Sequence, residues 1–435
     1  MKRKIAQHLI QWSQAKARKP LVVNGARQVG KTYSLRAFGR ECFESLVHLD
    51  FSAQPEYRQI FAGDITPRAL IPLLEALSHA HIEAGKTLLV FDEVQMCPRA
   101  LTSLKYFCEQ APEYHVVAAG SLLGVTLARG EESFPVGKVD MLPMNPLDFE
   151  EFMWAAGEEA LAALIPVALE NRSAFALHDR AMKLYRDYLL VGGMPEAVLA
   201  YRSARSVLAA RQVQENLMNA YVADMAKHSG PAETARILSV WEAVPQQLAK
   251  DNHKFQYATI GSSARAHQYE GAIAWLLASG MLLACHKVDA GAHPLKAHVQ
   301  HDFFKLYQGD SGLLAHRLGV DAQVLLSPSG DSARLRGVLA ENYVAQQLHA
   351  MGAELFYWGI ASKSEVDFVV DGDAGAVPVE VKSGENVTAR SLSSYRQKYS
   401  PQRVVRISAK GIGEHGNVLS VPLYAVHCLA KELGV

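Results

Sequence analysis

Short apolar runs and amphipathic stretches follow one another along the first third of the chain. The runs have the length of buried strands, whereas the stretches between them repeat apolar residues at helical spacing, as Leu70, Leu73, Leu74 and Leu77 do. Strand-like segments lie at 21–23, 45–51, 87–95 and 114–122, and helical segments at 1–18, 32–38, 67–84 and 100–109. This alternation predicts an α/β fold in which helices cover both faces of a parallel sheet.

Beyond this region the pattern becomes mainly helical. From Glu150 to about Ala226 the chain is rich in Ala, Leu, Glu and Arg at helical spacing, with breaks at Gly192, Gly193 and Pro195. We interpret this stretch as a helical lid. A run of Ser, Pro, Gly and Asp at 326–332 has the composition of a domain boundary. The predicted domains are 1–150 for the α/β domain, 151–230 for the lid, 231–328 for a middle region and 329–435 for a C-terminal domain.

The middle region combines helical and strand-like segments. Its predicted elements are helices at 236–248 and 264–277, a strand at 281–288 and a turn at 309–312. This order is compatible with a winged helix, which would either contact DNA or pack domains together. Only Arg265, His267 and Lys287 favour a nucleic-acid face, so charge favours the packing role.

A glycine-rich segment links the first apolar run to the first core helix. Gly25 to Thr32 matches the pattern G-x-x-x-x-G-K-[ST]. Gly25 and Gly30 permit a turn whose backbone N–H groups face a polyphosphate, and the following helix adds its positive end. Lys31 is expected to reach the β- and γ-phosphates, and Thr32 to join a Mg2+ shell. We expect ATP to bind through Gly25, Ala26, Arg27, Gln28, Val29, Gly30, Lys31, Thr32 and Tyr33.

Two adjacent carboxylates end the apolar run within 87–95. Asp92 and Glu93 would face the crevice at the carboxyl ends of the strands, where open α/β sheets bind ligands. Asp92 is predicted to support Mg2+, and Glu93 to act as the general base that orients the attacking water. Ser121, at the end of the next strand, would hydrogen-bond that water or the γ-phosphate. A Gly-Ser turn with a capping hydroxyl is the alternative for Ser121.

A second set of polar residues lies in the last hundred positions. Glu341 falls on a helical segment, Asp367 on a strand, and Glu380 and Lys382 on the next strand. Period-two alternation places Glu380 and Lys382 on one face, and a hairpin would bring Asp367 beside them. Two carboxylates and a lysine can hold Mg2+ and orient a water for phosphodiester attack. The alternative is a surface hairpin in which Glu and Lys merely pair.

Composition narrows the classes of protein. A chain of 435 residues is too long for one core, and 44 basic against 44 acidic residues give no overall charge that favours nucleic acid or an acidic membrane. Five dispersed cysteines without a C-x-x-C pair are typical of reduced thiols in the cytoplasm, which is the expected location. The longest uncharged apolar stretch, 271–285, is too short for a bilayer, so no membrane partner is expected. Local positive charge after the second site favours a phosphate-bearing partner; it comes from Arg390, Arg396, Lys398, Arg403 and Arg406.

These motifs resemble a known family when taken together. The phosphate loop, the Leu-Val-Phe-Asp-Glu-Val-Gln strand, the Ala-Gly-Ser strand end and the segments 142–152 and 188–198 resemble bacterial and archaeal AAA-type ATPases with a C-terminal domain of unknown function. The resemblance covers nearly the whole chain. It implies an AAA+ core, a helical and winged-helix middle, and a nuclease-like C-terminal domain. Family members commonly have Gly-Arg where this chain has Gly137-Lys138, and Lys lacks the planar fork that suits a γ-phosphate. Arg129 is a nearby substitute for a sensing arginine, but the favoured interpretation of Arg129 is an exposed loop residue.

The C-terminal order of Glu, Asp and Glu-x-Lys resembles the PD-(D/E)xK nuclease core. The helix at 388–398 and the strand at 403–407 also fit that core. By this resemblance Asp367 and Glu380 would be metal ligands, Lys382 the catalytic lysine and Glu341 an auxiliary acid. Our leading hypothesis is an ATP-hydrolysing AAA+ motor or switch, with a homo-oligomer as its candidate assembly, coupled to a nuclease-like domain that acts on DNA. The alternatives are a nucleotide-gated interaction protein whose C-terminal domain binds without cleaving, and a degenerate C-terminal domain used only for assembly.

Overall fold

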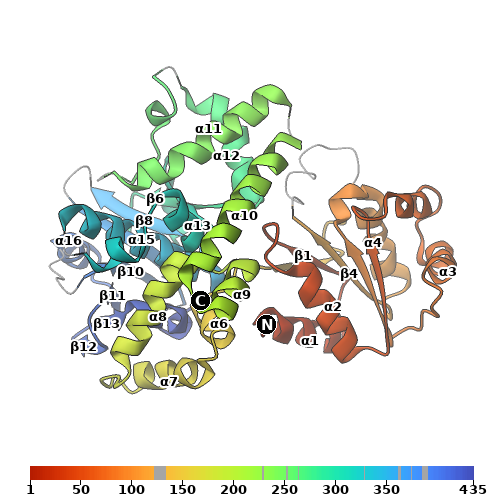
Figure 1. Cartoon of the computed structure of the whole chain (residues 1–435), viewed down its shortest axis with the longest axis horizontal. Coiled ribbons are helices and arrows are strands. Elements are labelled where there is room, and N and C mark those ends of the chain that lie inside the picture. The colour runs from red at the N-terminus through yellow and green to blue at the C-terminus, as the bar shows by residue number, and fades with distance from the viewer. Residues whose placement is uncertain are drawn as a thin grey trace. The chain divides into compact units, whose positions relative to one another are not determined.

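The computed structural model forms two compact units (Figure 1). It describes residues 1–121, 134–227, 230–250, 253–262, 264–327, 329–360, 364–373, 375–384 and 390–435. The first unit, called here the N-terminal unit, contains Lys2–Asn145 and Ala278–Gly280. The second, the C-terminal unit, contains Met1, Pro146–Leu277 and Met281–Val435.

The N-terminal unit is a parallel sheet with flanking helices. Its strands are β1 (Leu21–Asn24), β2 (Ser45–Asp50), β3 (Thr87–Asp92), β4 (His115–Gly120) and β5 (Asp140–Pro143). Its helices are α1 (Ile5–Gln14), α2 (Lys31–Cys42), α3 (Pro67–Ser78) and α4 (Pro98–Gln110), with 3-10 turns η1 (Pro55–Phe61) and η2 (Val94–Met96). The strand order is β2-β3-β4-β1-β5, and every pair is parallel. The predicted α/β class is therefore confirmed.

The apolar runs explain why β3 and β4 are central. Every residue of both strands is buried, as expected for strands covered on two faces. On one face the rings of Phe51, Phe61, Phe91 and Phe107 pack edge-on or tilted, with centroids 5.4–6.4 Å apart. This core fixes the carboxyl end of β3, where Asp92 lies.

The C-terminal unit contains a helical half and a mixed sheet. Its helices are α6 (Phe149–Ala155), α7 (Glu159–Glu170), α8 (His178–Val191), α9 (Pro195–Ala204), α10 (Val207–Lys227), α11 (Pro231–Leu248), α12 (Ala266–Ala278), α13 (Ser311–Arg317), α14 (Ala322–Leu326), α15 (Gly330–Ala350), α16 (Arg390–Tyr399) and α17 (Ala430–Leu433), with 3-10 turns η3 (Tyr257–Thr259), η4 (Leu295–His298) and η5 (Leu423–Cys428). Its strands are β6 (Leu282–Val288), β7 (Val299–Gln308), β8 (Phe356–Ile360), β9 (Ser364–Gly372), β10 (Gly375–Val381), β11 (Val404–Ser408), β12 (Gly413–His415) and β13 (Val418–Pro422).

One sheet runs through the middle region and the C-terminal region of this unit. Its strand order is β12-β13-β11-β10-β9-β8-β6-β7. Strand β6 corresponds to the predicted strand at 281–288, in the region whose order is compatible with a winged helix. It forms a hairpin with β7 and pairs with β8 in parallel register. Strands on both sides of the suggested boundary near residue 328 therefore share one hydrogen-bonded sheet.

The glycine pair after α8 is enclosed by backbone and a carboxylate. Gly193 donates its N–H to Asp310 Oδ2 at 2.6 Å, and its carbonyl accepts from Leu147 N–H at 2.7 Å. A Cβ on Gly193 would lie 2.0 Å from Leu147 O, so no larger residue fits. The break that the sequence shows at this position therefore reflects close packing between segments distant in the chain.

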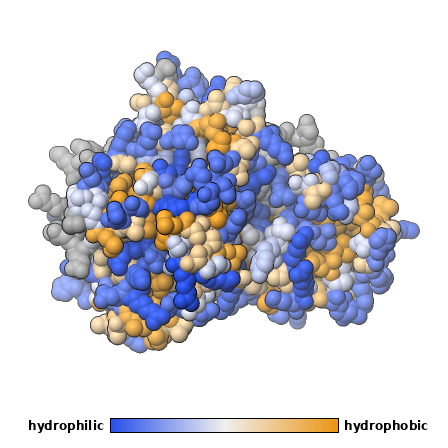
Figure 2. Space-filling model, in the orientation of Figure 1, coloured by the Kyte–Doolittle hydropathy of each residue, from blue (hydrophilic) through white to orange (hydrophobic). Residues whose placement is uncertain are grey.

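Polar residues dominate the visible surface. Figure 2 shows hydrophilic residues over most of this face, with hydrophobic ones in separate patches. Within the described ranges, no helix combines the length and the apolar character that crossing a membrane requires.

Candidate functional site

The loop between β1 and α2 is shaped by its two glycines. A Cβ on Gly25 would lie 2.1 Å from Met144 O, so the residue after β5 approaches too closely for a side chain. Gly30 precedes the first residue of α2 with φ 97°, in the left-handed region that favours glycine. Both glycines are therefore needed for this turn, which leads directly into the N-terminus of a 12-residue helix.

Lys31 is folded over the loop. Its Nζ donates to Gly25 O at 2.9 Å and to Ala26 O at 2.8 Å. Burial lowers the pKa of Lys31 to about 8, although the nearby carboxylates Glu93 and Asp92 oppose that shift. These two carbonyl contacts hold the Lys31 ammonium against the loop.

Asp92 receives three hydrogen bonds at the end of β3. Thr32 Oγ1 donates to its Oδ2 at 2.6 Å, His48 Nε2 lies 3.1 Å from the same oxygen, and Glu93 N–H donates to Oδ1 at 3.0 Å. Burial alone would raise the pKa of Asp92, but the bonds from His48 and Thr32 outweigh it and hold the pKa below its usual value. Asp92 is therefore a carboxylate that directly faces the loop's threonine. The Thr32 hydroxyl and this carboxylate are the oxygen donors that Mg2+ prefers, so the residues fit that ion.

A glutamine links the other two predicted catalytic residues. Gln95 Nε2 donates to Glu93 Oε2 at 2.5 Å and lies 3.5 Å from Ser121 Oγ. Glu93 has a left-handed backbone with φ 50°, which is uncommon for a non-glycine residue and turns the chain after β3. Sequence reasoning assigned no role to Gln95 or His48. Gln95 could have been suggested by its position two residues after Glu93. His48 could not, because the sequence does not indicate which strand supplies a partner for Asp92.

The remaining nucleotide-binding predictions fall on the same turn. Ala26 and Val29 are buried, Arg27 lowers the pKa of Lys31, and Gln28 has φ 64°. Tyr33 is 61% exposed on the first turn of α2.

Lys138, at the position where a sensing arginine would be expected, is paired with a carboxylate. Lys138 Nζ lies 2.9 Å from Glu109 Oε1, so its charge is paired with α4. Arg129, the suggested substitute, lies outside the described residues.

Three of the predicted C-terminal residues lie on neighbouring segments: Asp367 on β9, Glu380 on β10 and Lys382 directly after β10. These strands are antiparallel neighbours, and Asp367 Oδ2 accepts the backbone N–H of Val381 at 2.8 Å. Lys382 Nζ contacts Glu380 Oε1 at 2.7 Å. The other oxygen of Glu380, a residue only 3% exposed, has no hydrogen-bond partner within the part of the chain that the structure describes. Burial together with Glu380 and Glu341 raises the pKa of Asp367, and burial raises that of Glu380.

The orphaned oxygen and the crowded carboxylates fit a divalent cation. A cation between Asp367 and Glu380 would give Glu380 Oε2 a partner and offset the repulsion between the two acids. Among the described residues, no group of three or more His, Cys, Asp or Glu that could hold a metal ion occurs.

Glu341 has partners that the sequence did not indicate. Lys305 Nζ on β7 lies 2.9 Å from Glu341 Oε1, Tyr307 OH lies 2.5 Å from the same oxygen, and His253 Nδ1 lies 2.9 Å from Oε2. Lys305 is 1% exposed and also contacts Glu365 Oε1 at 2.8 Å. Burial alone would lower the pKa of Lys305, but Glu341, Glu365 and Asp367 raise it well above its ordinary value. Both oxygens of Glu341 are thus engaged by protein groups.

Comparison with known proteins assigns the N-terminal segment. Residues 17–153 match the family described as AAA domain. Residues 182–324 and 336–425 match two families described as domains of unknown function (DUF8612 and DUF4143). The search of curated proteins found no match.

Solved structures show a more distant likeness. ORC2 from Aeropyrum pernix, in ADPNP–ADP complexes, is 13% identical over 79% of this chain and 92% of that chain, with a TM-score of 0.38. Cdc6p from Pyrobaculum aerophilum is 14% identical over 73% and 94%, with a TM-score of 0.31. PCH-2 from C. elegans is 10% identical over 49% and 68%, with a TM-score of 0.30. These scores are too low to indicate a shared overall architecture.

The loop geometry and the family match agree for the first part of the chain. A glycine-shaped turn before a helix, its lysine, and a threonine bonded to the strand-end carboxylate lie inside the segment that resembles AAA domains. The N-terminal unit therefore carries a phosphate-binding loop inside a segment that is similar to AAA domains.

Proposed function

We propose that the N-terminal unit binds ATP with Mg2+ and hydrolyses it. The observation that carries the proposal is the 2.6 Å hydrogen bond from Thr32 to Asp92 beside the Lys31 loop. It joins the phosphate-binding turn to the acidic strand end, as nucleotide hydrolysis requires.

Each residue has a separate task in this proposal. The amides of Gly25 to Tyr33 surround the phosphates, and Lys31 turns from the loop carbonyls to the β- and γ-phosphates. Thr32 and Asp92 hold Mg2+, which when bound neutralises developing phosphate charge. Glu93 accepts the proton of the attacking water while Gln95 fixes the carboxylate, and Ser121 hydrogen-bonds the γ-phosphate or the water.

Two substitutions separate binding from turnover. Lys31→Ala is expected to abolish nucleotide binding, and Glu93→Gln is expected to bind ATP but to hydrolyse it at a rate lower by about 10²-fold or more, the scale of general base catalysis. Binding is measured with a fluorescent ATP analogue and turnover by phosphate release. Exposed Lys105→Glu on α4 is the matched control. Normal hydrolysis by Lys31→Ala would end the proposal.

For the C-terminal unit we propose a metal-dependent site for a phosphodiester, most simply in DNA. Asp367 and Glu380 would hold Mg2+, and Lys382 would orient the water. The alternative, binding without cleavage, is favoured by one observation: the auxiliary acid Glu341 is already bonded to Lys305 and His253. A domain used only for assembly is the third candidate.

A cleavage assay distinguishes the three candidates. The whole chain is incubated with single- and double-stranded DNA and RNA and with Mg2+ or Mn2+, beside Asp367→Ala and Lys382→Ala. Cleavage lost in both variants supports a nuclease, and binding without cleavage supports an interaction module. The absence of both leaves assembly.

The proposal also covers the location, the assembly and the domain organisation of the protein. We propose a cytoplasmic protein that assembles as a homo-oligomer, with a lid at 151–230, a winged-helix-like region at 231–328 and a nuclease-like domain at 329–435. Basic residues after the second site support a nucleic-acid partner, although Arg396 already donates to Asn417 and Arg403 pairs with Glu432.

A further inference from the structure

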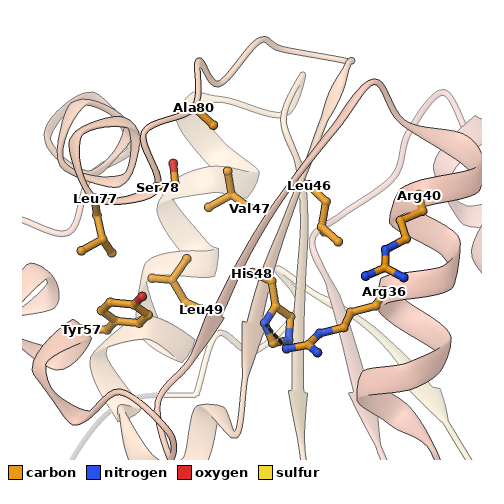
Figure 3. Close-up of a pocket in the computed structure, with 10 residues that line it drawn as sticks. All are labelled: Arg36, Arg40, Leu46, Val47, His48, Leu49, Tyr57, Leu77, Ser78 and Ala80. Atoms are coloured by element: carbon orange, nitrogen blue, oxygen red, sulfur yellow. Dashed lines mark hydrogen bonds between the residues drawn. The ribbon is translucent and has the colours of Figure 1, made fainter.

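Beside β2, the outermost of the described strands of the N-terminal sheet, lies a groove whose lining contains none of the predicted nucleotide-binding residues. The groove has a volume of about 450 Å3 and runs beside β2, the edge strand. Residues 46–49 line it without a gap, so it follows the strand itself rather than one of its faces. Figure 3 shows the side chains of this segment diverging to the two sides of the strand.

Among the described strands, only β3 pairs with the backbone of β2. Phe51 donates its N–H to Asp92 of β3 at 3.2 Å, so the odd-numbered residues along this segment direct their backbone groups at β3. Because these groups alternate along a strand, Leu46 and His48 direct their N–H and C=O groups away from β3 and into the groove. The groove thus offers a hydrogen-bonding edge.

One flank of the groove is basic. Arg36 and Arg40 extend from α2 on the side of Leu46 and His48 (Figure 3). Both arginines are exposed, and Arg36 Nη2 lies 3.3 Å from His48 Nδ1. Two guanidinium groups on one side of an extended backbone favour carboxylates at alternate positions of a ligand.

The other flank is largely apolar. Val47 and Leu49 point to the opposite side of β2, toward Tyr57 on η1 and Leu77 on α3 (Figure 3). Tyr57 and Leu77 are only partly buried, so they retain surface that a ligand could cover. The residues between the acidic positions of such a ligand would therefore be apolar.

We propose that this groove binds an extended peptide of another protein as an added strand beside β2. The peptide alternates acidic side chains, which face Arg36 and Arg40, with apolar side chains, which face Tyr57 and Leu77. A small phosphate-bearing ligand would use the arginines but leave the strand edge and the apolar flank uncovered. An extended acidic peptide uses all three features, and its binding does not depend on ATP hydrolysis.

The first test selects peptides from a random display library against the whole chain. All measurements use a Lys31→Ala background, so that the nucleotide site does not capture acidic ligands. Enriched peptides are expected to alternate acidic and apolar residues. Their affinity should fall about tenfold in Arg40→Glu, the scale of one charge-assisted contact. Lys105→Glu, an exposed charge reversal on α4, should leave it unchanged.

The second test addresses the strand-like geometry. Two versions of the tightest-binding peptide are made. One carries backbone N-methyl groups on its odd-numbered residues and the other on its even-numbered residues, and these are the two registers. One register should lose about tenfold in affinity or more, because methylation removes the N–H groups that pair with β2, and the other should bind normally. Equal effects in the two registers would overturn the proposal. So would the lack of any enriched peptide, peptides insensitive to Arg40→Glu, or Arg40-dependent binding of inorganic polyphosphate alone.

Discussion

His48 Nε2 lies 3.1 Å from Asp92 Oδ2, and this contact joins β2 to the strand end that carries the candidate nucleotide site. The same carboxylate oxygen accepts from Thr32 at 2.6 Å. We therefore propose His48 as a positioning residue, which would orient the carboxylate that is predicted to support Mg2+.

Removing His48 is expected to weaken Mg2+ binding. His48→Ala should raise the Mg2+ concentration for half-maximal ATPase activity by about tenfold. This is the smaller loss of metal affinity that is typical when a residue supporting a metal ligand is removed. His48→Gln should restore part of the loss because an amide can still donate. A Mg2+ titration at fixed ATP is the measurement, and His81→Ala, on the exposed pair with Glu75, is the control. An unchanged titration in His48→Ala would remove this role.

Nucleotide binding should take up a proton above pH 8. The pKa of Lys31 is lowered to about 8, so the amine is largely neutral at pH 9 in the nucleotide-free protein. A triphosphate favours the ammonium form, so binding at pH 9 draws a proton from the buffer, whereas binding at pH 7 does not. Titration calorimetry in buffers of different ionisation enthalpy measures this uptake. Equal proton uptake at pH 7 and at pH 9 would contradict the assignment to Lys31.

The same lowered pKa has a defined effect on stability. Between about pH 8 and the ordinary lysine value, the unfolded chain binds more protons at this position than the folded one, so Lys31 makes the nucleotide-free fold more stable as pH rises through that window. The contribution is lost as pH falls through 8.

Lys305 is expected to be essential for the C-terminal unit. Lys305→Met removes a buried ammonium and leaves Glu341 and Glu365 without it, which should cost about 3–5 kcal/mol of unfolding free energy. Adding Glu341→Gln should recover part of the loss by removing one uncompensated charge. Lys296→Met, in an exposed pair with Glu354, should change stability by less than about 1 kcal/mol. Denaturant unfolding followed by tryptophan fluorescence compares the variants, and equal stability of Lys305→Met and wild type would contradict the prediction.

The glycine pair after α8 should not tolerate a side chain. Gly193→Ala places a Cβ 2.0 Å from Leu147 O and should destabilise the unit by about 1–3 kcal/mol or more, as overpacking does. Gly337→Ala, within α15 and with no atom near its added Cβ, should instead stabilise by about 0.5–1 kcal/mol. Thermal unfolding of the two alanine variants measures the contrast. The same sign for both would show that the close approach at Gly193 relaxes easily.

The sequence predicted the parts that local pattern controls. The four strands β1 to β4 were recognised because their apolar runs lie between helical stretches, and β3 and β4 are buried throughout. The fifth strand, β5, was missed, since it is four residues long, ends in proline and is buried at none of its positions.

The same distinction between local pattern and tertiary contacts applies to the residues of the candidate sites. Lys31, Thr32, Asp92 and Glu93 could be named because a loop motif and a strand end carry them. The hydrogen-bond partners that other helices and strands supply to these residues could not be predicted from the sequence. The strand order that sets His48 beside Asp92 and the fold that sets Lys305 against Glu341 bring together residues 44 and 36 positions apart.

The pairing of β6 with β8 determines where the chain can be truncated without exposing an unpaired strand. A fragment that starts near residue 329 would expose the edge of β8 where β6 belongs, and it would also strip Glu341 of Lys305. Such a piece would be prone to aggregate, so the smallest independently folding segment that contains Asp367, Glu380 and Lys382 should begin before Leu282.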